Sequence, residues 1–150
     1  MLIKFEDQQK PKVFLGGTCN ESPWREELKP MLEINYFDPV VKDWDAKAQQ
    51  RELEERQTSD FVLYCITPRM TGVYSIAELI DDSNKRPEKT VFVLLTLDGD
   101  EEFDDSQLKS LERVGAMVET NGGQWFQSLE DAAEFMNSAG SRGGRTGEDE

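Results

Sequence analysis

Apolar residues in this chain gather into short runs separated by longer polar stretches. Two runs, residues 61–66 and 90–95, are almost continuously apolar, which is typical of strands buried on both faces. Shorter runs at residues 12–15, 34–37 and 116–119 predict three more strands. The intervening stretches predict five helices, at residues 23–32, 46–56, 75–81, 104–114 and 128–137. The residues expected to cap these helices are Ser22 (ahead of Pro23), Asp43 or Asp45, Asp104 or Asp105, and Ser128.

Strict alternation of strands and helices predicts an α/β domain whose parallel sheet is covered on both sides. Five strands favour a flavodoxin-like three-layer sandwich with the strand order 2-1-3-4-5. In that order the topological switch point lies between the first and third strands, and ligands bind there at the carboxyl ends of the strands. The loops at residues 16–19 and 68–74 are therefore expected to face one crevice.

The length of 150 residues fits one domain, which we place at residues 11–138. Residues 1–10 are polar and are expected to form a flexible arm. Residues 139–150 contain Gly, Ser, Arg, Thr and acids, a composition that predicts a disordered tail. The helix at residues 46–56 is so polar that most of it should be solvated or face a cleft.

The formal net charge of −14 argues against binding to a polynucleotide, because such binding depends on neutralising phosphates with Lys and Arg. Single nucleosides and nucleotides remain possible, since a local pocket can differ from the overall field. Acids cluster at residues 98–105, and the simplest interpretation is a solvated surface. A docking surface of a protein-interaction adaptor is a second interpretation of the same cluster.

The chain contains no histidine, which excludes a Ser-His-Asp or Cys-His catalytic site and a histidine-based zinc site within it. We therefore expect no metal and no cofactor. Cys19 and Cys65 show no metal-binding spacing and are expected to be buried. Two isolated cysteines without a signal peptide indicate a cytoplasmic setting, and no apolar run is long enough to cross a membrane.

The main candidate for chemistry is Glu78, an acid early in the helix that follows the apolar run at residues 61–66. A carboxylate at such a strand end can be a nucleophile or a general base. It can also be an ordinary acid near a helix start, where the dipole favours negative charge. Glu52 is a second candidate, because a neighbouring acid would shift the pKa of one carboxyl and orient the other. Carboxylate pairs of this kind perform sugar-transfer chemistry.

The pair Gly16 and Gly17 matches neither a P-loop nor a dinucleotide fingerprint. It indicates either a tight turn or a backbone that a ligand approaches closely. Aromatic residues near the proposed strand ends would either stack on a nucleobase or pack in the core; they are Phe14, Trp24, Trp44 and Tyr74.

Taken together, residues 11–137 resemble the nucleoside 2-deoxyribosyltransferase family, in particular its shorter bacterial and phage branch. The order and spacing of several short motifs support the resemblance. These motifs are residues 13–18 (VFLGGT), 24–25 (WR), 36–39 (YFDP), 59–64 (SDFVLY), 66–68 (ITP) and 72–78 (GVYSIAE).

The resemblance implies a flavodoxin-like fold and a ping-pong transfer of deoxyribose between bases. Glu78 stands where the family's nucleophile forms a covalent glycosyl ester, and Glu52 matches the acid that supports it. The substrate-binding positions implied are Gly16, Gly17, Thr18, Asp38, Thr71, Gly72, Tyr74 and Ser75. Family members also borrow a residue from a neighbouring subunit, which implies a homo-oligomer.

One departure is Gly72, where family transferases carry a polar side chain. Related proteins hydrolyse nucleoside monophosphates and bind phosphate with Ser and Arg, a role open to Arg25 and Arg69, although surface positions are the more common place for Arg. Two functions follow. The first is an enzyme that cleaves or transfers the N-glycosidic bond of nucleosides or nucleotides through a glycosyl-Glu intermediate. The alternative is a catalytically idle protein of the same fold that binds a nucleotide or nucleotide-like signal.

Overall fold

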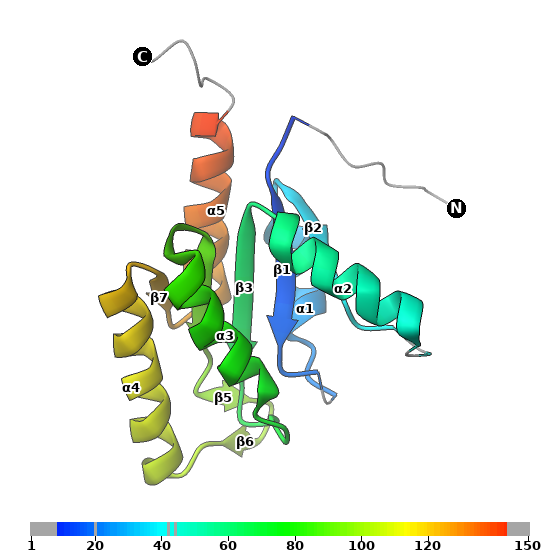
Figure 1. Cartoon of the computed structure of the whole chain (residues 1–150). Helices are drawn as coiled ribbons and strands as arrows, with labels where there is room; N and C mark the ends of the chain where they lie inside the picture. The colour runs from blue at the N-terminus through cyan, green and yellow to red at the C-terminus, as the bar shows by residue number, and fades with distance from the viewer. Residues whose placement is uncertain (1–8, 20, 42, 44, 144–150) are drawn as a thin grey trace.

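The computed structural model describes residues 9–19, 21–41, 43 and 45–143. Five parallel strands form one sheet in the order β2-β1-β3-β4-β7. These strands are β1 (Lys12–Gly17), β2 (Asn35–Phe37), β3 (Phe61–Ile66), β4 (Thr90–Leu94) and β7 (Gln124–Phe126). The predicted flavodoxin-like architecture and the predicted spatial order of five strands are confirmed (Figure 1).

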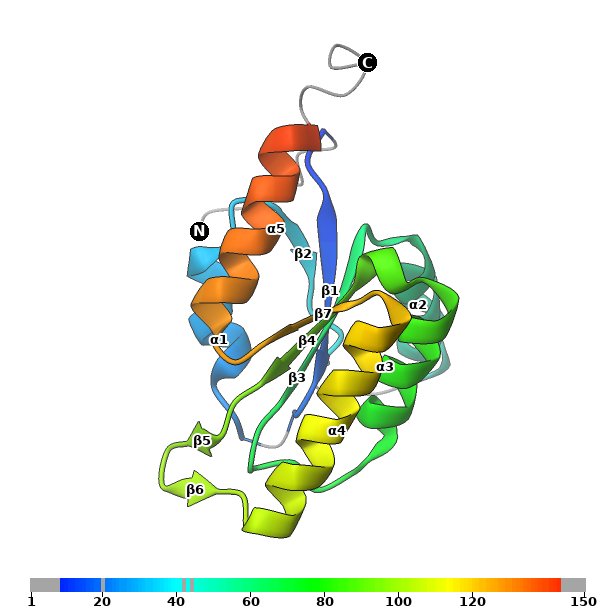
Figure 2. The ribbon, with the colours of Figure 1, turned by 90° about the vertical axis from the view of Figure 1, so that its left-hand side faces the viewer.

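Helices cover both faces of the sheet. They are α1 (Trp24–Leu28), α2 (Ala46–Thr58), α3 (Tyr74–Lys85), α4 (Asp105–Asn121) and α5 (Leu129–Gly143), with short 3-10 helices η1 (Lys29–Met31) and η2 (Pro87–Lys89). Figure 2 shows α1 and α5 on one side of the sheet and α2, α3 and α4 on the other. The alternation of β1 follows this layering, because Val13 and Leu15 pack toward α1 and α5 while Phe14 packs with α3 and α4 residues.

The two central strands are the most deeply buried elements. Every residue of β3 and of β4 is buried, as their continuous apolar runs predict. Helix α2 is the opposite case, because none of its residues is fully buried, in agreement with its polar sequence. The sheet is therefore held by hydrophobic layers, whereas α2 needs another kind of attachment.

The predicted fifth strand at residues 116–119 is wrong, because this segment belongs to α4. Leu111, Gly115 and Val118 are buried at helical spacing, and a four-residue apolar run cannot distinguish that pattern from a strand. Gly122 ends the helix with φ 106°, and the fifth strand, β7, follows directly. Trp125 of β7 stacks on Phe92 of β4, with ring centroids 6.4 Å apart.

Helix caps agree with the sequence at three of four starts. Asp45 accepts a hydrogen bond from the backbone N–H of Ala48, Asp104 forms a capping box with Gln107, and Ser128 accepts from the N–H of Asp131. Ser22 does not cap α1 and instead bonds to a distant carboxylate.

Other segments differ in extent. Gly16 and Gly17 are the last two residues of β1 rather than a turn that follows it. Residues 97–102 form a small antiparallel hairpin, β5 (Leu97–Asp98) and β6 (Glu101–Glu102). Helix α5 continues to Gly143, so the first residues of the proposed tail are helical. The rest of that tail and most of the proposed N-terminal arm lie outside the described residues. In the part of the chain that the structure describes, no helix is long and apolar enough to cross a membrane.

We expect Gly122→Ala to lower the free energy of unfolding by about 1–2 kcal/mol, because an L residue is strained at the left-handed end of α4. Urea denaturation measures this change. Gly72→Ala is the matched control, since a Cβ at Gly72 meets no atom within 4 Å. Equal losses in both variants would contradict the assignment of this helix end.

Candidate active site

A cavity of about 300 Å³ lies at the carboxyl end of β1. At this point the order in which strands are added to the sheet switches direction, because β2 lies on one side of β1 and β3 on the other. Side chains from β1, α1, α2, α3 and the segment after β2 surround it. The lining residues are Phe14, Gly16, Gly17, Cys19, Arg25, Pro39, Val40, Val41, Glu52, Ser75 and Glu78. This volume is at the lower end of the range for small-molecule sites.

Glu78 lies in the second turn of α3, and no acid occupies the first turn. The helix dipole acts mainly on the first turn, so it does not explain this carboxylate. The side chain is 13% exposed. Burial raises the pKa of Glu78 to about 7; Arg56 opposes this rise, and the negative charges of Glu52 and Asp82 add to it. Near neutral pH the carboxyl is thus poised between its two protonation states.

Glu52 reaches the same cavity from α2, the neighbouring helix on the same face of the sheet. Burial raises the pKa of Glu52 as well, and the positive charges of Arg56 and Arg25 oppose that rise. Two carboxylates that are distant in sequence therefore line one cavity. This arrangement suits attack on a sugar carbon by one acid while the other orients the sugar or supports the first.

The two glycines at the end of β1 are required by the packing of the sheet. A Cβ on Gly17, which has φ 116°, would collide with the backbone carbonyl of Cys65 on β3. A Cβ on Gly16 would lie 2.7 Å from the ring of Tyr64. Both glycines line the cavity, so the tight packing also brings the backbone to its wall.

Arg25 was predicted to be a surface residue, and this is wrong because its side chain is buried. Its guanidinium donates hydrogen bonds to the carbonyl oxygens of Leu15, Thr18 and Gly17, at 3.1, 2.7 and 3.4 Å. Buried carbonyl oxygens need such donors, and Arg25 supplies them along the last residues of β1 and just after it. Arg25 therefore shapes the glycine segment and contributes a positive charge to the cavity wall.

Several predicted binding residues lie outside the cavity lining. Thr18 is buried, and its Oγ1 accepts from the N–H of Thr67 at 3.1 Å. Asp38 pairs with Lys29 at 2.8 Å and accepts from the N–H of Val40, so it orders the segment that carries Val40. Thr71 and Gly72 of the loop after β3 do not line the cavity. At the start of α3, Tyr74 does not line it either, whereas Ser75 does.

The aromatic and cysteine candidates divide in a similar way. Trp24 packs in the core and donates its indole N–H to the Thr18 carbonyl at 2.6 Å, while Phe14 is buried yet lines the cavity. Trp44 lies outside the described residues. Cys65 is buried as predicted, but Cys19 is exposed and lines the cavity, so its predicted burial is wrong.

Asp98 is an exception within the acidic cluster, whose other acids at residues 100–105 are exposed. It is buried, accepts a hydrogen bond from Ser22 at 2.5 Å and pairs with Arg69 at 3.2 Å. Burial alone would raise the pKa of Asp98, but hydrogen bonds from Ser22 and Thr67 and the charge of Arg69 outweigh it and lower the pKa. Asp98 thus joins the loops after β1 and β3, which flank the cavity.

Sequence reasoning missed Arg56, which approaches Glu78 from α2 at 3.7 Å between Nη1 and Oε2. Its place one helical turn after Glu52 puts both side chains on one face of α2. That spacing is visible in the sequence, but nothing in the sequence shows that this face turns toward α3.

Among the described residues, no group of three or more His, Cys, Asp or Glu side chains is arranged to hold a metal ion.

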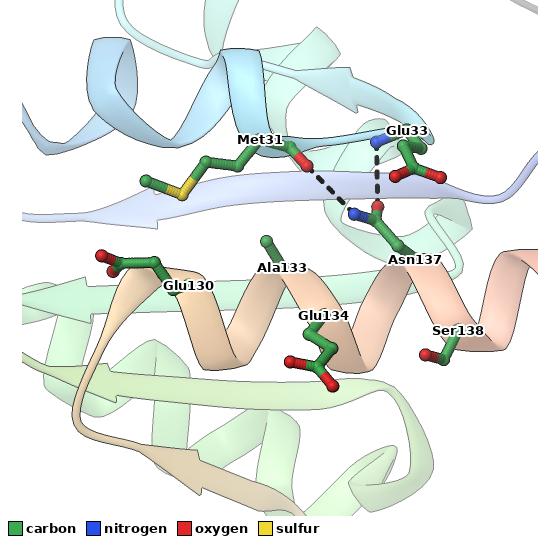
Figure 3. A pocket seen from close by; sticks show the side chains of 7 residues that line it. All are labelled: Met31, Glu33, Glu130, Ala133, Glu134, Asn137 and Ser138. Atoms are coloured by element: carbon green, nitrogen blue, oxygen red, sulfur yellow. Dashed lines mark hydrogen bonds between the residues drawn. The ribbon is translucent and has the colours of Figure 1, made fainter.

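A larger hollow of about 410 Å³ lies on the opposite layer, between η1 and α5 (Figure 3). Asn137 crosses it, accepting from the N–H of Glu33 at 2.9 Å and donating to the carbonyl of Met31 at 3.0 Å. The carboxylates on its rim, from Glu33, Glu130 and Glu134, are exposed. We favour the smaller cavity as the active site, because only there do acids enter partly buried surroundings.

Residues 10–97 match the model of a family described as nucleoside 2-deoxyribosyltransferase like. The match covers more than half of the 150 residues and includes every residue that lines the smaller cavity. Searches of the curated proteins and of the solved structures gave no match.

The raised pKa of Glu78 predicts a dependence of stability on pH. The folded chain holds this proton up to about pH 7, whereas the unfolded chain releases it near the ordinary value of 4.5. The contribution of Glu78 to stability is thus greatest below pH 4.5 and is lost as pH rises through about 7. We expect Glu78→Gln to raise the free energy of unfolding, measured by urea denaturation, by about 1–3 kcal/mol at pH 8 and to leave it unchanged at pH 4.

Glu54→Gln is the control for this prediction, because Glu54 is an exposed acid on α2. A Glu78→Gln variant no more stable than its parent at pH 8 would show that the carboxylate is not held in unfavourable surroundings.

Proposed function

We propose that this chain, which belongs to the nucleoside 2-deoxyribosyltransferase-like family, cleaves or transfers the N-glycosidic bond of nucleosides through a covalent ester on Glu78. The main support is that Glu78 and Glu52 approach one cavity from two different helices. The cavity also lies at the topological switch point of the parallel sheet, which is where ligands bind in such folds.

In the proposed reaction, the Glu78 carboxylate attacks C1′ of the sugar. The C1′–N bond breaks, and the base departs with the electron pair and takes up a proton. A second base or a water molecule then attacks C1′, and the Glu78 carboxylate leaves. Two displacements at one carbon retain its configuration, as in sugar chemistry with paired carboxylates. Glu52 would hold the sugar and support Glu78 during both steps.

The cavity lining combines two kinds of group that suit a nucleoside. Phe14, Pro39, Val40 and Val41 are apolar and suit the faces of a planar base. Glu52 and Glu78 can accept hydrogen bonds from sugar hydroxyl groups.

We infer that unphosphorylated substrates are preferred to nucleotides. Among the described residues that line the cavity, Arg25 is the single cation, and it already donates to three backbone carbonyls. Glu52 and Glu78 would repel a phosphate placed nearby. The charge of the cavity therefore favours a neutral ligand.

We expect Glu78→Gln and Glu78→Ala to reduce release of free base from 2′-deoxynucleosides by about a thousandfold or more, because the nucleophile is lost. Glu52→Gln should reduce it by about a hundredfold. Chromatography of a panel of nucleosides and nucleoside monophosphates after incubation measures both effects. Glu54→Gln should leave the rate unchanged, because Glu54 lies two residues after Glu52 on the same helix but is exposed and outside the cavity lining.

Equal rates of base release in Glu78→Gln and its parent would refute the role of Glu78. A parent that is thermally stabilised by nucleosides or nucleotides yet releases no base over hours would instead support the idle binding protein. One observation favours that alternative. Thr71, Gly72 and Tyr74, which precede Ser75 between β3 and the first turn of α3, contribute no side chain to the cavity lining.

We also propose that the chain forms a homo-oligomer through the surface around the cavity mouth. Large apolar side chains are exposed at Val40 and Val41, which line the cavity. Leu53, Val73 and Tyr74 are also exposed, and each lies within two residues of a lining residue in the sequence. Light scattering after gel filtration should give a dimer or larger, and Leu53→Glu should shift it toward monomer. A monomer at every concentration of the parent would contradict this assembly.

A further inference from the structure

Asp82 is a fully buried carboxylate on α3, one turn after Glu78. It accepts hydrogen bonds from the hydroxyl of Tyr64 at 2.6 Å, from Nε of Arg56 at 3.0 Å and from Nε of Arg86 at 2.8 Å. A buried charge is tolerated only when it is paired and hydrogen-bonded in this way. Asp82 is therefore a fixed point to which side chains from α2, α3 and β3 attach.

The guanidinium of Arg56 divides its contacts between this fixed point and Glu78. Nε bonds to Asp82 and Tyr64, and Nη2 bonds to Asp82 and Asp81 at 3.1 Å each. Nη2 also donates to the backbone carbonyl of Glu78 at 3.3 Å. The remaining nitrogen, Nη1, faces Oε2 of Glu78 at 3.7 Å, which is longer than a hydrogen bond.

This geometry attracts the Glu78 carboxylate without occupying its oxygens. A short, bidentate pair would hold both oxygens and hinder attack on a substrate. A positive charge held nearby by other partners stabilises the anion and leaves its lone pairs available. Because α2 has no fully buried residue, the same contacts of Arg56 also fix the helix that carries Glu52.

We propose that Arg56 is a positioning residue for Glu78 and Glu52, held in place by the buried carboxylate of Asp82. The proposal rests on the function proposed above, because the alignment of Glu78 matters for catalysis only if Glu78 is the nucleophile. Arg56 is not among the residues that line the cavity, and it acts through Glu78, which does line it.

Several charged or titratable groups lie around Glu78. Arg56 and Glu52 from α2 and Asp82 from α3 influence its protonation through their charges, and Tyr64 from β3 interacts with it. Two further groups act on these neighbours: Arg25 from α1 on Glu52, and Asp81 from α3 on Arg56. Arg56 is the nearest positive charge, so removing it should make Glu78 harder to ionise. Removing the Asp82 charge should do the reverse, since it deletes a like charge and leaves Arg56 less neutralised.

The test is a titration of the Glu78 carboxyl carbon by NMR in protein labelled with ¹³C-glutamate, with the signal assigned by its loss in Glu78→Gln. We expect Arg56→Met to raise the pKa of Glu78 by about one unit or more, and Asp82→Asn to lower it. In an active protein, the acidic limb of kcat/KM should move in the same directions, and the plateau should fall about tenfold or more in both variants.

Two further variants separate charge from geometry. Arg56→Lys keeps a positive charge but lacks the planar fork, so the pKa of Glu78 should stay within about half a unit while the plateau of kcat/KM falls. Arg51→Met is the control, because Arg51 lies on the same helix but is exposed and pairs with Glu55 at 3.6 Å. It should change neither quantity.

An unchanged titration of Glu78 in Arg56→Met overturns the proposal, and so does an upward shift in Asp82→Asn. If Arg56→Met does not fold, Asp82→Asn supplies the same titration. The NMR measurement needs no turnover, so a parent without activity would count against the proposed function while the test of Arg56 still gives a result.

Discussion

The arrangement of the candidate active site depends on the hydrogen bonds and ion pairs made by the buried carboxylate of Asp82. Arg56, Tyr64 and Arg86 surround this group, and together they join α2, β3 and α3. Helix α2 has no fully buried residue, and its other long-range contacts include the ion pair between Glu55 and Lys12 at 3.2 Å and the guanidinium of Arg51 over the ring of Phe37 at 5.2 Å. Asp82 is the fully buried partner among these contacts, and breaking a buried pair costs more than losing one that is partly exposed. We therefore expect the Asp82 contacts to contribute most to the position of Glu52.

The site is in tension with the stability of the fold. Glu78 is held in surroundings that disfavour its charge, which lowers the stability of the fold as this carboxyl ionises. The two hydrophobic layers on either side of β3 and β4 offset this loss, because all residues of both strands are buried. A buried central sheet can thus support a partly charged edge.

Local sequence signals were sufficient for most of the fold. Continuous apolar runs predicted β3 and β4, and polar caps predicted the starts of α2 and α4 at Asp45 and Asp104. The fifth strand was misplaced because the apolar run at residues 116–119 fits the buried face of a helix equally well. Contact between Trp125 and the neighbouring strand, which no local pattern reveals, selects β7 instead.

By itself, the sequence determined the α/β class, the order of strands, the position of Glu78 after a buried strand and its resemblance to a family. These follow from periodicity and short motifs, which are local properties of the chain. Only the tertiary structure decided that Arg25 is buried, that Asp98 joins two loops, and that Arg56 stands between Asp82 and Glu78. Charges of these kinds are equally common on surfaces, and only the packing of distant elements removes water from them and gives them partners.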